Sequence, residues 1–161
     1  MNIISHRGNI NGPIPEKENR PSYIDCAIAL GYDVEVDLRF VNENFWLGHD
    51  EPQYKIEETW MKLRKEKIWF HCKDIDSALM LIKMNCDFKY FCHTQDDYVI
   101  TSTGNLWVHD LTKTINENCI IPLLNEEDII NYENKEPYAI CTDYIDFLKT
   151  SDVYNECNKL N

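Results

Sequence analysis

The sequence lacks a long apolar segment. No run of apolar residues approaches the ~20 residues that a membrane-spanning helix needs. The first residues, Met1–Arg7, also lack the charged segment, apolar stretch and small-residue cleavage site that are typical of a secretory signal. We therefore expect a protein with no integral membrane segment.

Basic residues are scarce relative to acidic residues. The chain has 16 Lys and Arg against 28 Asp and Glu, which gives a formal net charge of −12. Such a surface repels nucleic acid and anionic membranes, so neither is expected as a partner. An anionic substrate would need a local cluster of cations or a metal ion that reverses the field.

Paired cysteine motifs are absent. The seven cysteines are an odd number, and no two of them form a Cys-x-x-Cys pair. Cys72, Cys92 and Cys141 fall in predicted strands, where a reduced cysteine serves as a small hydrophobic residue. We expect a reduced, intracellular (cytoplasmic) protein without a zinc site.

Glycine and proline are also few, with five and six residues, which excludes a collagen-like or low-complexity chain. The 161 residues, of which 43% are hydrophobic, can bury a core without disulfides or metal staples. Neither an internal repeat nor a Gly/Ser-rich linker marks a boundary. Residues 1–161 are therefore predicted to form a single domain.

Short apolar runs alternate with helical patterns along the chain, which favours a parallel α/β sheet. Eight strands suit a closed barrel, but the chain is well short of the ~250 residues of a typical one. The segment 87–124 also leaves almost no room for helices. We predict a shortened or incomplete TIM-type (β/α) barrel, with a doubly wound open sheet as the alternative. Besides a short strand at 45–47, strands are predicted at residues 3–5, 33–39, 68–72, 89–93, 98–101, 106–109, 119–121 and 138–141.

Two predicted helices have apolar residues at helical spacing. In a helix over about 57–67, Trp60 and Leu63 are expected to face inward. Asp74 is expected to cap the next helix. The buried face of that helix is predicted to consist of Ile75, Ala78, Leu79 and Ile82.

Strand 33–39 carries three carboxylates spaced by two residues, at Asp33, Glu35 and Asp37. They share one face of the strand, while its apolar residues share the other. In a barrel the acidic face would point inward, where buried like charges are costly unless a cation neutralises them. A hard divalent ion would solve this problem. The alternative is an antiparallel strand with one acidic face in water.

Two histidines follow predicted strands. His6 is followed by Arg7 and Gly8, and His49 lies between Gly48 and Asp50. Histidine can move a proton near neutral pH, and the planar fork of arginine matches phosphate oxygens. By itself His6 could equally be a structural residue, and a lone histidine at a strand end such as His49 is more often structural than functional.

Taken in order, these elements resemble the glycerophosphodiester phosphodiesterase family, one of the barrel phosphodiesterases related to phosphatidylinositol phospholipase C. The resemblance is strong over residues 3–52 and weaker at 141–144 and 106–108. It is carried by His6-Arg7-Gly8, Glu18-Asn19 before a helix, Glu35-x-Asp37 in a strand, and His49-Asp50.

The resemblance implies a barrel with a divalent ion, Mg²⁺ or Ca²⁺, at the carboxyl ends of the strands. Glu35 and Asp37 would be metal ligands, and Arg7 would hold phosphate. His6 and His49 would be the catalytic proton-transfer pair. Glu18 and Asn19 would order the first loop and its polar contacts with substrate.

The chain departs from the family pattern in its length and on the third strand. Where the family has a third metal carboxylate, this chain has His71, two residues before Lys73. His71 is predicted either as the third metal ligand or as a phosphate contact. Lys73 is predicted to contact phosphate. His93 is predicted either to add a substrate-binding group or only to cap a loop.

The function implied by the resemblance is metal-assisted hydrolysis of a glycerophosphodiester or a similar small phosphodiester. A neighbouring hydroxyl of the substrate would attack first, and a cyclic phosphate would form on the way. Two alternatives remain open. One is a lyase that stops at the cyclic phosphate, and the other is a barrel that binds phosphoesters without turnover.

Overall fold

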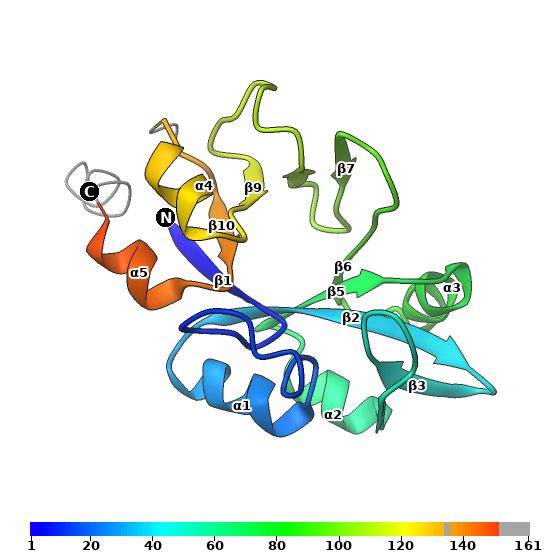
Figure 1. Ribbon diagram of the computed structural model, residues 1–161. Coiled ribbons are helices and arrows are strands. Elements are labelled where there is room, and N and C mark those ends of the chain that lie inside the picture. Colours follow the sequence, from blue (N-terminus) through cyan, green and yellow to red (C-terminus); the bar gives the residue numbers. More distant parts are fainter. Residues whose placement is uncertain (134–135, 152–161) are drawn as a thin grey trace.

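The computed structural model describes residues 1–133 and 136–151, which share one mixed sheet with helices packed against it (Figure 1). The strands are β1 (Asn2–His6), β2 (Asp33–Val41), β3 (Asn44–Leu47), β4 (Tyr54–Ile56), β5 (Ile68–Cys72), β6 (Lys89–Cys92), β7 (Tyr98–Ile100), β8 (Leu106–Val108), β9 (Cys119–Pro122) and β10 (Ala139–Thr142). The helices are α1 (Pro21–Ala29), α2 (Glu58–Leu63), α3 (Ile75–Met84), α4 (Glu126–Asn131) and α5 (Ile145–Thr150). Among the described residues, no helix is both long and apolar enough to cross a bilayer.

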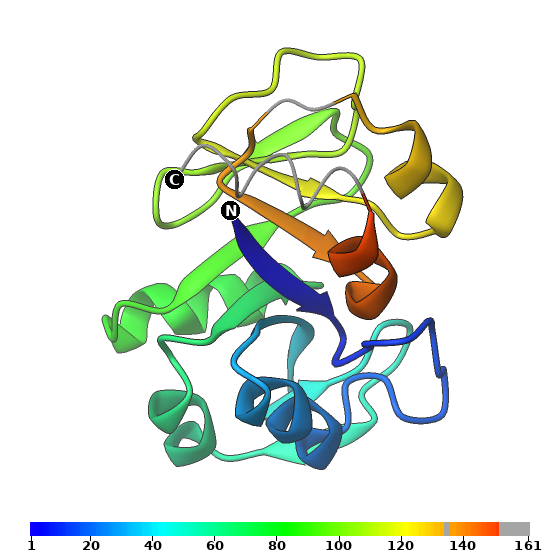
Figure 2. The ribbon, with the colours of Figure 1, turned by 90° about the vertical axis from the view of Figure 1, so that its left-hand side faces the viewer.

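Seven strands run parallel, in the spatial order β8, β9, β10, β1, β2, β5 and β6. Figure 2 shows β1 and β10 side by side and pointing the same way, although they lie near opposite ends of the chain. The far end of β2 carries the antiparallel strands β3 and β4, and β7 pairs antiparallel with β8. Parallel strands bring their carboxyl ends to one edge, so groups from distant parts of the sequence meet there.

The sheet curls into a partial barrel. The edges of the curl are β6 and the hairpin of β7 and β8, which contact each other through backbone and side-chain bonds. The Ser102 amide donates to the Tyr90 carbonyl at 2.8 Å, and the Tyr90 amide donates to the Ser102 hydroxyl at 2.9 Å. The prediction of an α/β fold with an incomplete barrel is confirmed at this level.

Helices cover the outer face of the curled sheet. The apolar residues Val34, Val36 and Leu38 of β2 are fully buried and pack in one cluster with Ile24 of α1 and Met61 of α2. The acidic residues of β2 therefore point to the inner face, as the alternation of strand side chains requires. The expectation that the apolar side of this strand packs on helices is confirmed.

The inner face is filled mainly by large aromatic side chains. The ring of Phe91 stacks on Trp107 with centroids 4.1 Å apart, and Trp107 lies 6.2 Å from Trp69. Ile4 and Ile120 complete this inner cluster together with Ala139 and Cys141. The aromatic contacts join β5 and β6 to β8 across the interior, where no continuous strand ladder links them.

Two predicted helix faces are wrong. In α3 the side chains of Ile75, Leu79 and Ile82 are exposed, while Ser77 and Leu81 are buried beside Ala78. In α2, Leu63 is 83% exposed and Met61 is buried in its place. The i, i+4, i+7 spacing identifies a helix face, but the docking angle on the sheet decides which face is buried.

Other details of the predicted elements also differ. The expected helix over 57–67 is shortened to α2, and β4 was missed because three residues carry too little alternation to be recognised. Asp74 does cap α3, with its carboxylate accepting from the Ser77 amide at 2.7 Å. The sequence also predicts a last helix from about residue 144 to 157; the structure has α5 in this range, and the part after Ser151 lies outside the described residues.

Candidate active site

Glu35, Asp37 and His71 meet on the inner face of the sheet. Each offers a ligand atom within 4.8 Å of the others. The His71 Nδ1 atom lies 3.4 Å from the Glu35 Oε1 atom and 3.5 Å from the Asp37 Oδ1 atom. The parallel register of β2 and β5 places Asp37 directly beside His71, so the strands themselves bring the three groups together.

The hydrogen bonding of these groups fits a cation between them. The Nε2 atom of His71 lies 3.3 Å from the carbonyl oxygen of His93. Because a carbonyl oxygen only accepts hydrogen bonds, Nε2 must carry the hydrogen in this contact. In the neutral ring this leaves a lone pair on Nδ1 facing two carboxylates. The Oε2 atom of Glu35 and the Oδ1 atom of Asp37 are buried and have no hydrogen-bond partner among the described residues. Metal-ligating histidines usually donate their other ring N–H to a carbonyl, a carboxylate or water, and His71 has such a carbonyl acceptor.

Two fixed cations border the same carboxylates. The Arg7 Nε atom lies 2.9 Å from the Asp37 Oδ2 atom, and the Lys73 Nζ atom lies 3.5 Å from Asp37 Oδ1. Burial alone would raise the pKa of Asp37, but the charge of Arg7, a hydrogen bond from Asn19 and the charge of Lys73 outweigh it and lower the pKa. Asp37 is therefore an ionised carboxylate at neutral pH despite being fully buried.

The first loop is held in place by side chains that were predicted from the sequence. The Asn19 amide donates to Asp37 Oδ2 at 2.8 Å, and the backbone N–H of Asp37 donates to the Asn19 side-chain oxygen at 2.9 Å. Glu18 accepts from the Arg7 guanidinium at 3.1 Å and from the Asn9 amide at 3.0 Å. These bonds orient Arg7 toward Asp37 and agree with a loop-ordering role for Glu18 and Asn19.

The turn after β1 needs left-handed backbone. Arg7 has a φ of 54° and Gly8 has a φ of 95°. A side chain at position 8 would place its Cβ atom 2.8 Å from the Tyr23 ring, so a close approach as well as the positive φ favours glycine here. The tight turn directs the chain back over the carboxyl ends of the parallel strands, called here the mouth of the sheet, where Arg7 reaches Asp37.

His6 lies at the carboxyl end of β1, between two carboxylates. Its Nδ1 atom is 2.9 Å from the Asp143 Oδ1 atom, and its Nε2 atom is 3.8 Å from the Glu35 Oε2 atom. Burial lowers the pKa of His6, but the hydrogen bond to Asp143 and the charge of Glu35 outweigh it and raise the pKa. Since Asp143 holds the Nδ1 proton, Nε2 is the nitrogen that can exchange protons with a ligand.

A cavity of about 160 Å³ opens beside these groups. It is smaller than the ~300 Å³ at the lower end of pockets for drug-sized ligands, so it suits a small group or the head of a larger molecule. A separate cavity of about 400 Å³ borders Lys73 and His93 but none of the three candidate metal ligands. The 160 Å³ cavity is lined by His6, Arg7, Glu35, His71, Phe91, Trp107, His109, Pro122, Leu124 and Cys141.

His93 lies beside this cluster, and its ring pairs with the ring of a second histidine, His109. The His93 ring stacks on His109 at a centroid distance of 3.4 Å, and its own carbonyl is the acceptor for His71. Burial, followed by the charges of His93 and His71, lowers the pKa of His109 to about 4. His109 is therefore neutral at pH 7, and its buried Nε2 atom has no hydrogen-bond partner within residues 1–133 and 136–151.

His49 is not brought into the cluster. Its ring bonds to Asp50 at 2.7 Å, and the side chain is 43% exposed. The backbone before it is anchored at the same mouth, because the Gly48 amide donates to the Asp37 carbonyl at 3.0 Å. The loop that carries His49 therefore starts at the site, while the imidazole itself does not line the 160 Å³ cavity.

Three polar residues of the site were not singled out from the sequence. Asp143 and Asn9 bond to each other at 2.7 Å and together hold His6 and the first loop. His109, the last residue of the predicted strand 106–109, was not assigned a role in a site. Their positions could have identified them, because Asp143 and His109 each directly follow a strand of the parallel set.

Comparisons of this chain with protein-family models, with curated proteins and with solved structures found no match.

Proposed function

We propose that this protein cleaves a small phosphodiester, such as a glycerophosphodiester, with the help of a divalent metal ion. The observation that carries the proposal is the convergence of Glu35, Asp37 and His71 beside His6 and Arg7. The proposal also includes the finer fold assignment, a shortened TIM-type barrel of the glycerophosphodiester phosphodiesterase kind.

Glu35, Asp37 and His71 would hold the metal ion, Mg²⁺ or Ca²⁺. Two carboxylates suit a hard cation, and the imidazole is compatible with a borderline one. When bound, the ion would act as a Lewis acid that stabilises the charge developing on phosphate oxygens.

His6 would transfer protons through its Nε2 atom. Asp143 holds the opposite ring nitrogen, so the ring keeps one orientation while its protonation state changes. In the first step a substrate hydroxyl attacks phosphorus, one imidazole takes the hydroxyl proton, and the leaving alcohol oxygen receives a proton. Water then opens the cyclic phosphate by the reverse proton movements. Such general acid–base catalysis contributes ~10²–10⁴-fold.

Arg7 and Lys73 would bind the phosphate. Both side chains are less than one-fifth exposed, and both border Asp37, so their charges are fixed at the mouth of the sheet. They place positive charge beside the candidate metal ligands. His93 would add a substrate contact, and Glu18 and Asn19 would keep the loop of Arg7 in place.

His49 is proposed as the second proton-transfer group. This role requires its loop to turn the imidazole from Asp50 toward His6, with the anchor at Gly48 kept. The position of His49, together with the small cavity, favours one competing function, a barrel that binds a phosphoester without turnover. Tight binding with no product after long incubation would identify that function.

The test uses glycerophosphocholine as the probe and follows the products by phosphorus NMR. Glycerol phosphate as the final product supports hydrolysis, and a cyclic phosphate that accumulates identifies a lyase. Activity should fall in excess chelator and return with Mg²⁺ or Ca²⁺. Full activity in excess chelator would remove the metal from the proposal. The intracellular location stays a prediction.

A further inference from the structure

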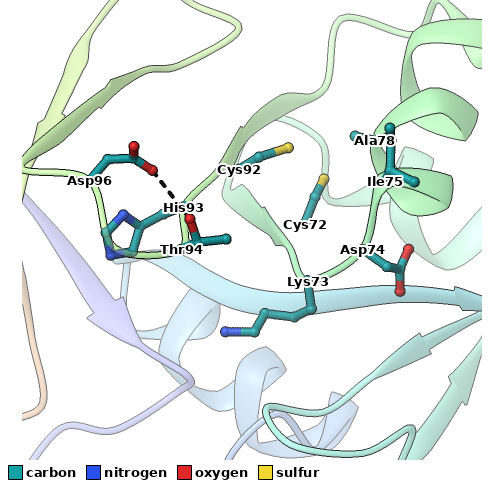
Figure 3. A pocket seen from close by; sticks show the side chains of 9 residues that line it. All are labelled: Cys72, Lys73, Asp74, Ile75, Ala78, Cys92, His93, Thr94 and Asp96. Atoms are coloured by element: carbon teal, nitrogen blue, oxygen red, sulfur yellow. Dashed lines mark hydrogen bonds between the residues drawn. The ribbon is translucent and has the colours of Figure 1, made fainter.

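A second cavity lies on the opposite face of the same strand ends (Figure 3). It has a volume of about 400 Å³ and lies between the ends of β5 and β6 and the start of α3. His71 and Phe91 point to the inner face of the sheet, so the next residue on each strand, Cys72 and Cys92, points to the outer face. The two thiols therefore lie on the face opposite to the candidate metal ligands, while Lys73 and His93, directly after the two strands, also border the cavity.

Cys72 and Cys92 are partners in the parallel ladder of β5 and β6. Neighbouring strands lie ~4.8 Å apart, which is inside the range of Cα separations that a disulfide spans, ~4.4–6.8 Å. In Figure 3 both sulfur atoms point toward Ile75 and Ala78 of α3, whereas Lys73 points the other way. The two thiols thus share one cavity, and both are free.

The two thiols differ in access. Cys72 is 4% exposed, whereas Cys92 is an exposed residue at the cavity. An accessible thiol backed by a buried thiol on the neighbouring strand is the arrangement of an attacking and a resolving cysteine.

We propose that Cys92 and Cys72 form a thiol–disulfide exchange site, whose ligand is a low-molecular-weight disulfide of the glutathione class. The exchange does not rest on the proposed phosphodiester chemistry, because neither thiol belongs to that site, although Lys73 and His93, which are proposed to contact phosphate and substrate, also border the cavity. Disulfides in reducing compartments are usually transient and serve redox sensing, and a pair that can open and close suits such a role.

The exchange proceeds in two balanced steps. The Cys92 thiolate attacks one sulfur of the small disulfide, which forms a mixed disulfide and releases one small thiolate. Cys72 then gives up its proton and attacks the Cys92 sulfur, which forms the Cys72–Cys92 bond and releases the second small thiol. The protein loses two electrons and two protons, and the small disulfide gains both.

The cavity can hold the small molecule while the first step occurs. Its lining combines the apolar side chains of Ile75 and Ala78 with polar groups from the loop after β6, Thr94 and Asp96. The Thr94 hydroxyl bonds to Asp96 at 3.4 Å and keeps this wall in place. The volume is within the ~300–1,000 Å³ of small-molecule sites.

The test incubates the full chain with oxidised glutathione, alkylates the remaining thiols and identifies each cysteine by peptide mass spectrometry. We expect a Cys72–Cys92 linked peptide as the main product in the wild type, with loss of two alkylatable thiols that a reductant restores. Cys72→Ser should stop at a glutathione adduct on Cys92. Cys92→Ser should leave Cys72 reduced.

The matched control is Cys26→Ser, which removes an exposed cysteine on α1 outside this cavity. That variant should form the Cys72–Cys92 bond as readily as the wild type. The proposal is overturned if the wild type keeps both thiols, or if it accumulates an adduct on Cys92 that Cys72 never resolves. The wild-type experiment decides this even if a serine variant fails to fold, which circular dichroism would detect.

Discussion

The two faces of the sheet at the ends of β5 and β6 carry opposite chemistry. The inner face presents His71 to the carboxylates Glu35 and Asp37, and the outer face presents Cys72 and Cys92 to a cavity beside α3. Oxygen and imidazole ligands suit hard or borderline cations, whereas thiols suit exchange with sulfur or soft metals. Because side chains alternate along a strand, adjacent residues such as His71 and Cys72 point to opposite faces of the sheet.

The faces also differ in how they contribute to stability. The outer face is largely an apolar contact with helices, in which Phe70, Val36 and Leu38 are fully buried. The inner face at the mouth buries charges that need partners, and Asp37 has four of them in Arg7, Asn19, Lys73 and His71. Changes in the apolar part of the outer face should therefore affect folding more than metal binding, and changes at the charged end of the inner face the reverse.

The largest effect is expected from His6→Ala, an inner-face change. Loss of the proton-transfer group should lower kcat/KM for glycerophosphocholine by ~10²–10⁴-fold. His49→Ala is the matched variant. A similar loss would support its role as the second proton-transfer group, and an unchanged rate would assign that role elsewhere. If both variants keep full activity, His6 and His49 are not the catalytic pair.

Phe70→Ala tests the outer face. This change removes a fully buried ring that packs edge-on against Phe88 at 5.5 Å, so the free energy of unfolding should fall by about 3–5 kcal/mol in urea titrations. Divalent-ion affinity of the folded protein should stay the same. Phe91→Ala, on the inner face, should also alter ion affinity, because Phe91 stacks on His71 at 4.7 Å. Equal ion affinities in the two variants would contradict the division between faces.

His71→Ala separates metal binding from folding. The affinity for Mg²⁺ or Ca²⁺, measured by isothermal titration calorimetry, should fall by at least ~10-fold, since even the loss of a supporting partner costs a metal site that much. The adjacent outer-face variant Cys72→Ala is the control and should keep wild-type affinity. A His71→Ala protein that binds the ion as well as the wild type would show that His71 contacts phosphate instead.

The smallest effect concerns His109 and pH. Its pKa falls from 6.5 to about 4 on folding, so the unfolded chain binds the extra proton first as the pH falls. Stability should therefore decrease as the pH drops from about 6.5 to about 4. His109→Gln should lose less stability over that range in urea titrations at a series of pH values. Identical pH slopes for the two proteins would contradict a buried, neutral His109.

Much of the fold could be read from local pattern. The strict alternation around Val34 and Val36 predicted β2 and the face that packs on helices, and the structure confirms both. The exposed side of α3 could not be read in the same way, because Ile75 and Leu79 have helical spacing but lie outside the contact with the sheet. Docking geometry, which depends on the whole sheet, overrides spacing within one helix.

The candidate site shows the same division. His6, Arg7 and Glu35 follow short-range patterns, so sequence reasoning found them. Asp143 was not singled out, because it is 137 residues from His6 and becomes its partner only when β10 lies beside β1. His109 was not assigned to the site from the sequence for the same reason, since its stacking on His93 depends on the curl of the sheet.

Local sequence is enough to predict which residues carry charge, which strands alternate and on which face of β2 the carboxylates lie, because these properties depend on residues a few positions apart. Three pairings come from the folded arrangement instead: His71 faces those carboxylates, Asp143 holds His6, and His49 bonds to Asp50 without lining the cavity. Such pairings depend on how strands from distant parts of the chain come together in register, and no local pattern of side chains encodes that.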